Sequence, residues 1–387
     1  MTSELRGGET QAVTAGGSRV AGLLAFIKRE AVLVVLVVAL ILLQVFHTQP
    51  VAALAKMIDW ETMLTLTGLL VLTRVIDMSG AMNWAAHRLL HRVRTERGLA
   101  LVLVLFAALL STVLTNDVAL FAVIPVTISL DRLVTIPLRR LVIVIALAVN
   151  AGSILTPLGN PQNLFLWGAS GVSFGAFVLA MAPLTAVLMI GLAGLTALMF
   201  GGKQLDLPDE QAHDKVEGRV LAIATGAFAL FIALADAHHA GIACALVLAG
   251  FGIWRRKAVL GIDWLLLAVF ALMFMVLRTV AALPAVHSWF TDANLADPLR
   301  AFAAGALTSQ VISNVPAAIM LESFSRHWQA LAYGVSVGGF GWCVGSLANL
   351  IAMRLAPVKG IFWRFHLVSV PFFGFALVVG GLLVRWF

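Results

Sequence analysis

Long runs without any charged side chain constrain this chain more than any other feature. Residues 141–200 contain no Asp, Glu, Lys or Arg, and shorter uncharged runs cover 31–46, 98–116 and 220–235. A helix that spans a membrane needs roughly 20 apolar residues. Charged residues make up only 12% of the 387 residues, whereas an ordinary soluble domain carries about 25%. We therefore expect an all-α polytopic membrane protein.

The apolar runs and their breaks predict about nine transmembrane helices. They lie near 31–47, 59–78, 138–160, 173–200, 218–235, 239–254, 262–281, 330–353 and 362–386. Two further apolar segments, 98–130 and 298–324, are each interrupted by polar residues near the middle. Each is too long for one helix, so we predict two re-entrant hairpins that enter and leave the membrane on the same side.

The basic residues predict the orientation. One predicted face collects Arg88, Arg92, Arg94, Arg97, Arg132, Arg139, Arg140, Lys203, Lys215, Arg255, Arg256, Lys257 and Lys359. The other collects only Lys56, Arg300, Arg326 and Arg385. The positive-inside rule makes the first face cytoplasmic. The N-terminus is then inside and the C-terminus outside, in a bacterial inner membrane. This distribution explains the net charge of +7 without a nucleic-acid partner.

Segments outside the spans complete this topology. Residues 1–30 are predicted to be a mobile cytoplasmic N-terminus and 201–217 a cytoplasmic linker. The mixed apolar and basic stretch Trp84–Arg97 is predicted to lie as a helix along the cytoplasmic interface. An alternative reading makes 31–46 the core of a signal peptide, although the polar leader before it is long for one.

The two halves of the chain resemble each other, at 31–200 and 218–387. Three motifs recur in the same order: I-D-W at 58–60 and 262–264, S-x-x-x-[S/T]-N at 111–116 and 309–314, and a glycine-rich break at 152–163 and 338–349. An odd number of span steps separates matching helices, so the repeats are predicted to be inverted. The hairpin at 98–130 then enters from the cytoplasm and the hairpin at 298–324 from outside. Inverted repeats with interrupted helices are typical of secondary transporters.

The interrupted segments supply the candidate binding groups. A helix that breaks inside a membrane exposes N–H groups, which favour anions, and C=O groups, which can coordinate Na⁺ with hydroxyl and amide oxygens. The candidates are Ser111, Thr115, Asn116, Asp117, Asn150, Gly152, Thr156, Gly159, Asn160, Asn163, Ser309, Ser313, Asn314, Gly345, Ser346 and Asn349. A sodium ion is expected at Thr115, Asn116, Ser313 and Asn314. The alternative for each Ser or Gly is a bond to its own helix or close helix packing.

Three ionisable residues of the predicted spans and hairpins are candidates for a functional role. Asp117 could carry a coupling proton, ligate Na⁺ or cap a helix. Arg74 and Arg278 occupy matching positions and could attract an anion, or reach to the interface. Asp59 and Asp263 are predicted to begin helices rather than to do chemistry.

Other functional classes lack their signatures. The chain has no GxxxxGK[ST] phosphate-binding loop and no H-E-x-x-H zinc motif. We therefore expect no enzyme activity and no cofactor beyond a coupling ion, H⁺ or Na⁺. An intramembrane enzyme that uses Asp117 is the alternative from another class.

Several of these segments resemble the ion transporter superfamily. They are I-D-W-E at 58–61, L-T-N-D at 114–117 and T-P-L-G-N-P-Q-N at 156–163. The superfamily includes the citrate transporter-like, arsenite efflux, divalent-anion/sodium symporter and NhaD-type sodium/proton antiporter families. The resemblance covers about residues 31–386. It is greatest to short bacterial proteins described as anion transporters.

The resemblance implies a scaffold domain, a moving domain with two hairpins, elevator-type alternating access and a homodimer in lipid. It also implies one cation half-site at Ser111, Thr115, Asn116 and Gly159, and a second at Ser309, Ser313, Asn314 and Gly345. The chain departs from the dicarboxylate symporters, which carry Ser-Asn-Thr at both tips, whereas this chain has T-N-D at 115–117 and S-N-V at 313–315. Sodium-coupled dicarboxylate uptake is thereby disfavoured.

We therefore expect a secondary active transporter of a small inorganic or carboxylate anion, coupled to H⁺ or Na⁺. A sodium/proton antiporter and an arsenite/antimonite efflux permease are the alternatives.

Overall fold

The structure is a computed structural model that describes residues 30–386 except 91–92, 134–135, 206–214 and 357. The described first half contains α2 (Ala31–Phe46), α3 (Val51–Met57), α4 (Trp60–Met78), α5 (Ala81–Leu90), α6 (Glu96–Val113), α7 (Asn116–Leu133), α8 (Leu138–Gly152), α9 (Pro161–Ser170) and α10 (Phe174–Met199). The helix α11 (Gly218–Asp236) follows. The second half contains α12 (Ala240–Trp254), α13 (Arg256–Leu260), α14 (Trp264–Ala282), α15 (Pro284–Asp292), α16 (Pro298–Ile312), α17 (Asn314–Leu321), α18 (Trp328–Val337), α19 (Leu347–Leu355) and α20 (Ile361–Val384).

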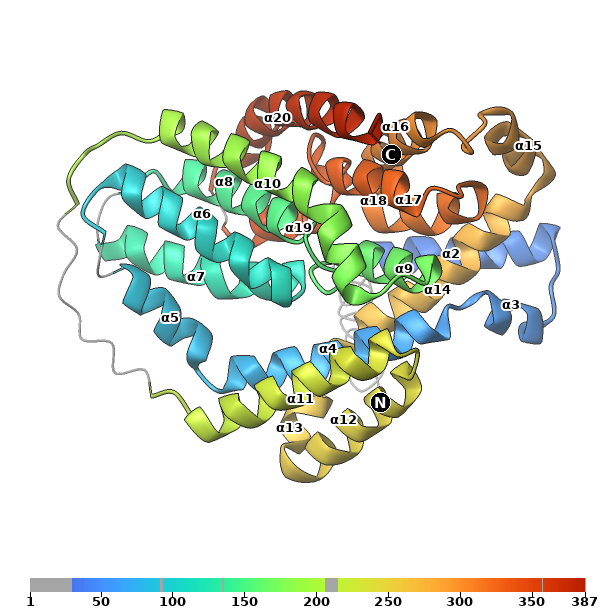
Figure 1. Cartoon of the computed structure of the whole chain (residues 1–387), viewed down its shortest axis with the longest axis horizontal. Coiled ribbons are helices and arrows are strands. Elements are labelled where there is room, and N and C mark those ends of the chain that lie inside the picture. The colour runs from blue at the N-terminus through green and yellow to red at the C-terminus, as the bar shows by residue number, and fades with distance from the viewer. Residues whose placement is uncertain (1–29, 91–92, 134–135, 206–214, 357, 387) are drawn as a thin grey trace, which may run out of the picture.

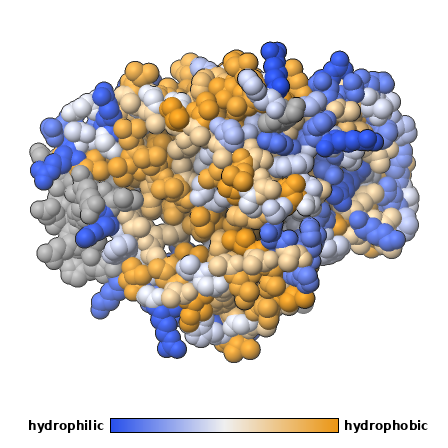
Figure 2. Space-filling model, in the orientation of Figure 1, coloured by the Kyte–Doolittle hydropathy of each residue, from blue (hydrophilic) through white to orange (hydrophobic). Residues whose placement is uncertain are grey.

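The prediction of an all-α polytopic membrane protein is confirmed. In the described part of the chain, five helices are long and apolar enough to cross a membrane by length and composition: α6, α10, α11, α14 and α20. The apolar helices α2 and α12 are shorter. Figure 2 shows hydrophobic residues over the middle of the visible face and hydrophilic residues towards its left and right edges. That pattern suits a protein whose central band contacts lipid.

The two halves carry their helices in the same order. The series α2 to α10 corresponds to α12 to α20, and α11, between the two series, has no counterpart among the described residues. Helices of the two halves also exchange partners, because α2 packs on α14 while α12 packs on α4. The inverted orientation and the cytoplasmic side stay predictions.

Each predicted hairpin is a pair of packed helices. The first consists of α6 and α7, which contact each other and meet at Leu114 and Thr115. It occupies the left half of Figure 1. The second consists of α16 and α17, which meet at Ser313. Each tip therefore falls at the polar interruption that the sequence placed in the middle of the apolar segment.

Two spans are broken in their middle. After α8 ends at Gly152, the chain is irregular until Asn160, whose side chain accepts a hydrogen bond from Asn163 N and caps α9. Pro161 is the first residue of α9, where its missing N–H costs nothing. The predicted span end at 160 was wrong, since α9 continues the segment to Ser170. The matching break lies between α18 and α19 and contains a short 3₁₀ turn at Cys343–Gly345.

The broken helices are the most buried parts of the molecule. Every residue of α8 from Leu141 to Gly152 is buried, and so is every residue of α18 from Ala330 to Val337. Large exposed apolar side chains lie instead on α10 and α12, for example Leu198 and Ile253. The candidate groups therefore sit at the centre of the protein, and helices with lipid-facing side chains surround them.

The stretch Trp84–Arg97 is not one continuous helix, and its location along the cytoplasmic interface stays a prediction. The helix α5 ends at Leu90, and α6 begins only at Glu96. Thr95 has an extended backbone and pairs with Gln204, while its side chain caps α6 by accepting a bond from Gly98 N. The predictions for residues 1–29 and for 206–214 of the linker lie outside the described residues.

Candidate functional site

The first hairpin presses directly against α8 near their ends. A Cβ atom on Gly152 would meet the Ala108 carbonyl and would lie 2.6 Å from Ser111 Oγ. One residue beyond the tip, Asn116 N donates to the carbonyl of Gly159 over 3.1 Å. Glycine at 152 and 159 is therefore what allows the hairpin to reach the broken helix.

The second hairpin repeats this contact. A Cβ atom on Gly338 would overlap the side chain of Ser309, with Oγ at 2.6 Å, and would lie 3.1 Å from the Ala306 carbonyl. A Cβ atom on Gly345 would overlap the Gly338 carbonyl inside the break itself. At both the α6–α8 and the α16–α18 crossing, a glycine thus faces an Ala and a Ser that lie three residues apart, near the end of the hairpin's first helix.

Side-chain hydrogen bonds stabilise the irregular segment between α8 and α9. Asn160 Nδ2 donates to Ser153 Oγ at 3.0 Å, and Asn163 Nδ2 donates to the Ile154 carbonyl at 3.1 Å. The Thr156 hydroxyl donates to the carbonyl of Thr112 on the hairpin. These bonds satisfy backbone groups that the missing helical turns leave free.

Two hydrogen bonds join the breaks of the two halves. Asn150 Nδ2 donates to Asn349 Oδ1 at 2.8 Å, and Ser336 Oγ donates to Asn163 Oδ1 at 3.4 Å. All four side chains are buried. Asn150 and Ser336 occupy matching positions, each two residues before the glycine at which the helix ends. Asn163 and Asn349 also match, so the two hydrogen bonds join equivalent positions of the two halves.

Both hairpin tips contain a buried oxygen without a hydrogen-bond donor. Asn116 Oδ1 and Ser313 Oγ have no partner among the described residues, although each residue is only 7% exposed. Their tip neighbours Thr115 and Asn314 are buried as well. Ser313 also has φ of +76°, a conformation that costs a non-glycine residue about 1–3 kcal/mol. Unpaired buried oxygens and retained strain are both expected at a ligand site.

The hydroxyl groups of Ser111 and Ser309 are used within their own helices. Ser111 Oγ donates to the Ala108 carbonyl at 2.9 Å, and Ser309 Oγ donates to the Gly305 carbonyl at 2.6 Å. Ser346 caps α19, since its side chain accepts a bond from Ala348 N at 3.3 Å. These contacts leave the serine oxygens able to accept a further bond or to contact a cation.

Asp117 faces a cavity of about 290 Å³ beside the first tip. The cavity is lined by Leu70, Thr73, Arg74, Asp77, Thr115, Asp117, Val118, Phe121, Ala122, Gly261, Ile262, Asp263 and Leu266. Arg74 is paired with Asp77 at 2.8 Å, and Asp263 caps α14 by accepting from Leu266 N. The Asp117 carboxylate itself accepts no hydrogen bond from any described residue. It is the acidic group of the cavity that remains free to exchange a ligand.

The corresponding region of the second half is filled by Arg278. Its guanidinium donates to the Met57 carbonyl at 2.7 Å, lies 3.9 Å from Asp59 Oδ2, and stacks over the rings of Phe165 and Phe274. Arg74, the matching residue, makes no such bond to Gly261, which corresponds to Met57. The two halves therefore differ at this position: a cavity lies beside Arg74 in the first half, whereas Arg278 fills the matching region in the second half.

Sequence reasoning missed two polar residues of the breaks. Ser336 was not recognised as the counterpart of Asn150. Gln310 was not considered, yet its Nε2 donates to the carbonyls of Gly338 and Phe340, at 2.7 and 3.1 Å, and its Oε1 accepts from Trp342 N. A glutamine inside an apolar hairpin helix is itself a signal, because an amide in lipid is costly without partners.

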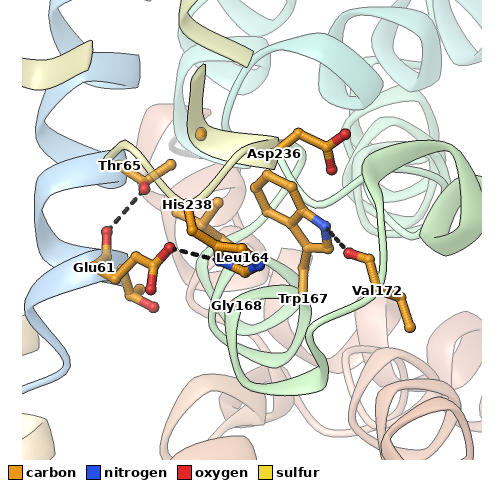
Figure 3. A pocket seen from close by; sticks show the side chains of 10 residues that line it. Glu61, Thr65, Leu164, Trp167, Gly168, Val172, Asp236 and His238 are labelled. Atoms are coloured by element: carbon orange, nitrogen blue, oxygen red, sulfur yellow. Dashed lines mark hydrogen bonds and ion pairs between the residues drawn. The ribbon is translucent and has the colours of Figure 1, made fainter. Parts of the chain in front are cut away.

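A second, small cavity lies where α4, α9 and the α11–α12 turn meet (Figure 3). His238 Nδ1 lies 3.2 Å from Glu61 Oε1, and Asp236 accepts a bond from Phe174 N at 2.5 Å. The contact of His238 with Glu61 ties the α11–α12 turn to the start of α4, away from the hairpin tips.

Comparison with known proteins agrees with this architecture, since residues 21–325 match the citrate transporter family. The chain belongs to that family. It is 44% identical over 328 residues to the inner membrane protein YbiR of Escherichia coli (strain K12), covering 84% of this chain and 88% of YbiR. It is 26% identical over 330 residues to the transporter MJ0456 of Methanocaldococcus jannaschii, covering 84% and 87%. The transporter Rv2684 of Mycobacterium tuberculosis is 26% identical over 349 residues, with 80% and 81% covered.

These matches confirm the resemblance to the ion transporter superfamily and the expectation of a membrane transporter rather than an enzyme.

Proposed function

We propose that this chain is a secondary active transporter that moves a small anion across a bacterial inner membrane, coupled to H⁺ or Na⁺. The observation that carries the proposal is the pair of hairpin tips. Each tip holds a buried oxygen without a donor, at Asn116 and Ser313, and each packs on a helix broken by glycine. Oxygen ligands of this kind suit Na⁺. The hairpin tips could equally bind the anion of a proton-coupled transporter.

The helix ends around the tips support an anionic substrate. The helices α7, α9, α17 and α19 all begin in the breaks or at the tips, and α7 contacts α19 while α17 contacts α9. Helix N-termini carry partial positive charge and bind anions through free N–H groups. The citrate transporter family favours a carboxylate among the possible anions.

Elevator-type movement is the proposed mechanism. The hairpins, the broken helices, α10 and α20 pack against one another as one set, while α2, α4, α11, α12 and α14 pack as another. The cavity at Asp117 opens where α7 meets α4 and α14, whereas Arg278 closes the matching place in the other half. With the basic face inside, this arrangement is an inward-facing state in which Asp117 can exchange ligand with the cytoplasm.

A sodium/proton antiporter is the second candidate. The cavity carries three carboxylates, from Asp77, Asp117 and Asp263, but one basic side chain, Arg74. An acidic lining attracts cations, and no residue in the described ranges forms an ion pair with Asp117.

Charge movement in proteoliposomes on a solid-supported membrane tests these candidates. Citrate, succinate, sulfate, phosphate and arsenite are each supplied with and without Na⁺ at two pH values. Asp117→Asn is the test variant and Asp131→Asn, at the far end of the same helix, is its matched control. A current that requires an anion, depends on pH or Na⁺ and is lost only in Asp117→Asn supports coupled anion transport. A current evoked by Na⁺ without any anion rejects it in favour of the antiporter, and a response to arsenite alone favours efflux of arsenite or antimonite.

A further inference from the structure

A third cavity, distinct from those at Asp117 and His238, is lined mainly by basic side chains and lies away from the hairpin tips. It has a volume of about 610 Å³ and lies between the α7–α8 connection and the start of α20. Four basic side chains line it, from Arg139, Arg140, Lys359 and Arg364, against a single acidic one, from Asp131. The excess of positive charge in one concave place favours an anionic ligand.

Helix ends add to that charge. The cavity is lined by Pro137 and Leu138 where α8 begins, and by Val358, Lys359 and Arg364 around the start of α20. The two helices contact each other, and among the described residues no capping side chain accepts a hydrogen bond from either N-terminus. The helices have 15 and 24 residues, and their dipoles add positive potential to that of the four cations.

Arg139 gives an independent sign of a missing ligand. Its Nε is buried and has no hydrogen-bond acceptor within the described part of the chain. Its neighbour Arg140 donates to the Met199 carbonyl at 3.0 Å. A buried guanidinium N–H without an acceptor is costly, and a phosphate oxygen is an acceptor that matches guanidinium geometry.

The surroundings identify the source of that phosphate. Phe362 and Trp363, directly before Arg364, are 46% and 75% exposed. Exposed aromatic residues of this kind lie at the level of lipid headgroups. Arg139, Arg140 and Lys359 also belong to the predicted cytoplasmic face, where anionic lipids bind basic pockets between helices. The geometry points to a binding site for the phosphate of an anionic phospholipid, formed by Arg139, Arg140, Lys359 and Arg364.

Native mass spectrometry of the purified full-length protein tests this assignment with phosphatidylglycerol, phosphatidylcholine and inorganic phosphate as probes. We expect preferential retention of phosphatidylglycerol. Each removed cation, in Arg139→Gln or Arg364→Gln, should weaken retention about fivefold, since one such charge contributes about 1 kcal/mol. Arg256→Gln, an exposed cation on the same predicted face, is the matched control and should retain the lipid.

Three outcomes overturn the assignment. The first is equal retention of the two lipids, and the second is unchanged lipid retention in the double variant Arg139→Gln/Arg364→Gln. The third is retention of inorganic phosphate that matches or exceeds that of phosphatidylglycerol. The last would assign the cavity to a free anion. Thermal unfolding without added lipid checks that each variant is folded. If Arg139→Gln is unfolded, the exposed Arg364 and Lys359 carry the test.

Discussion

Asn150 and Asn349 share a buried hydrogen bond of 2.8 Å, although they lie in opposite halves of the chain. Asn349 also donates to the carbonyl of Gly339, so it bonds a neighbouring broken helix and its own break at once. The counterpart link from Ser336 to Asn163 is longer, at 3.4 Å. The two broken helices are therefore joined by two side-chain hydrogen bonds. Each bond links a residue just before the break of one half to a residue just after the break of the other half.

Asn349→Ala should destabilise the protein by about 1–3 kcal/mol, because it leaves the buried amide of Asn150 short of an acceptor. Ser336→Ala should cost less, since the hydrogen bond that it removes is longer. Thermal unfolding in detergent measures both. In a double-mutant cycle, Asn150→Ala and Asn349→Ala should couple by about 0.5–3 kcal/mol. Strictly additive effects would show that the bond between them contributes nothing.

Gly152→Ala and Gly338→Ala should both destabilise, by about 1–3 kcal/mol each, because the added methyl group overlaps the hairpin helix. In each case a serine Oγ lies 2.6 Å from the new Cβ. Gly194→Ala in α10 is the matched control, since apart from its own helix backbone no described atom lies within 4 Å of its Cβ position. There, alanine should be neutral or stabilise by up to about 1 kcal/mol. Equal melting temperatures for all three variants would contradict close packing at the two crossings.

Much of the fold could be predicted because lipid leaves few alternatives. Uncharged runs had to become helices, and the polar interruptions at 115–117 and 313–315 had to be protected inside the protein. The asparagines at the tips and breaks were recognisable for the same reason. The end of the first broken span was missed because α9 is short and begins at Pro161, so it looked like the end of a helix.

The cross-half bonds could not be read from the sequence. Asn150 and Ser336 differ in type, so a motif search does not match them, although they occupy the same position before Gly152 and Gly338. The different surroundings of Arg74 and Arg278 were equally hidden, because the two residues match in sequence. Only the packing distinguishes the open cavity at Asp117 from the region that Arg278 fills.

Asp263 caps α14 and also lines the Asp117 cavity. Two substitutions distinguish the contribution of the cap from that of the negative charge. Asp263→Ala should lower stability by about 0.5–2 kcal/mol, because it removes the cap that bonds Leu266 N at 2.9 Å. Asp263→Asn keeps a capping oxygen and should melt like the wild type, yet it removes a negative charge from the cavity and should change the transport rate. Asp59→Asn, the matching cap outside the cavity, is the control. Identical transport in both Asn variants would mean that the cavity charge is irrelevant.

Arg278→Gln should weaken the contacts of α14 with the end of α3 and with α9. The variant loses the bond to the Met57 carbonyl and the stacking on Phe165 and Phe274. Cation–π contacts contribute about 0.5–2 kcal/mol, and an elevator must break the contact with Phe165 as α9 moves. We expect a lower melting temperature together with faster accessibility of a single Cys introduced at Ser313. Arg74→Gln, whose partner Asp77 is on the same helix, should leave both quantities near wild type.

Ser313→Gly should separate stability from transport at the second tip. Glycine tolerates φ of +76°, so the change relieves about 1–3 kcal/mol of backbone strain and removes an unpaired buried oxygen. If that oxygen binds the coupling ion, the variant should melt at a higher temperature and transport more slowly. Ser313→Ala, which loses the oxygen but keeps the strain, should share the transport defect without the gain in stability. Wild-type transport by both variants would exclude Ser313 from the ion site and leave its strained backbone without a functional reason.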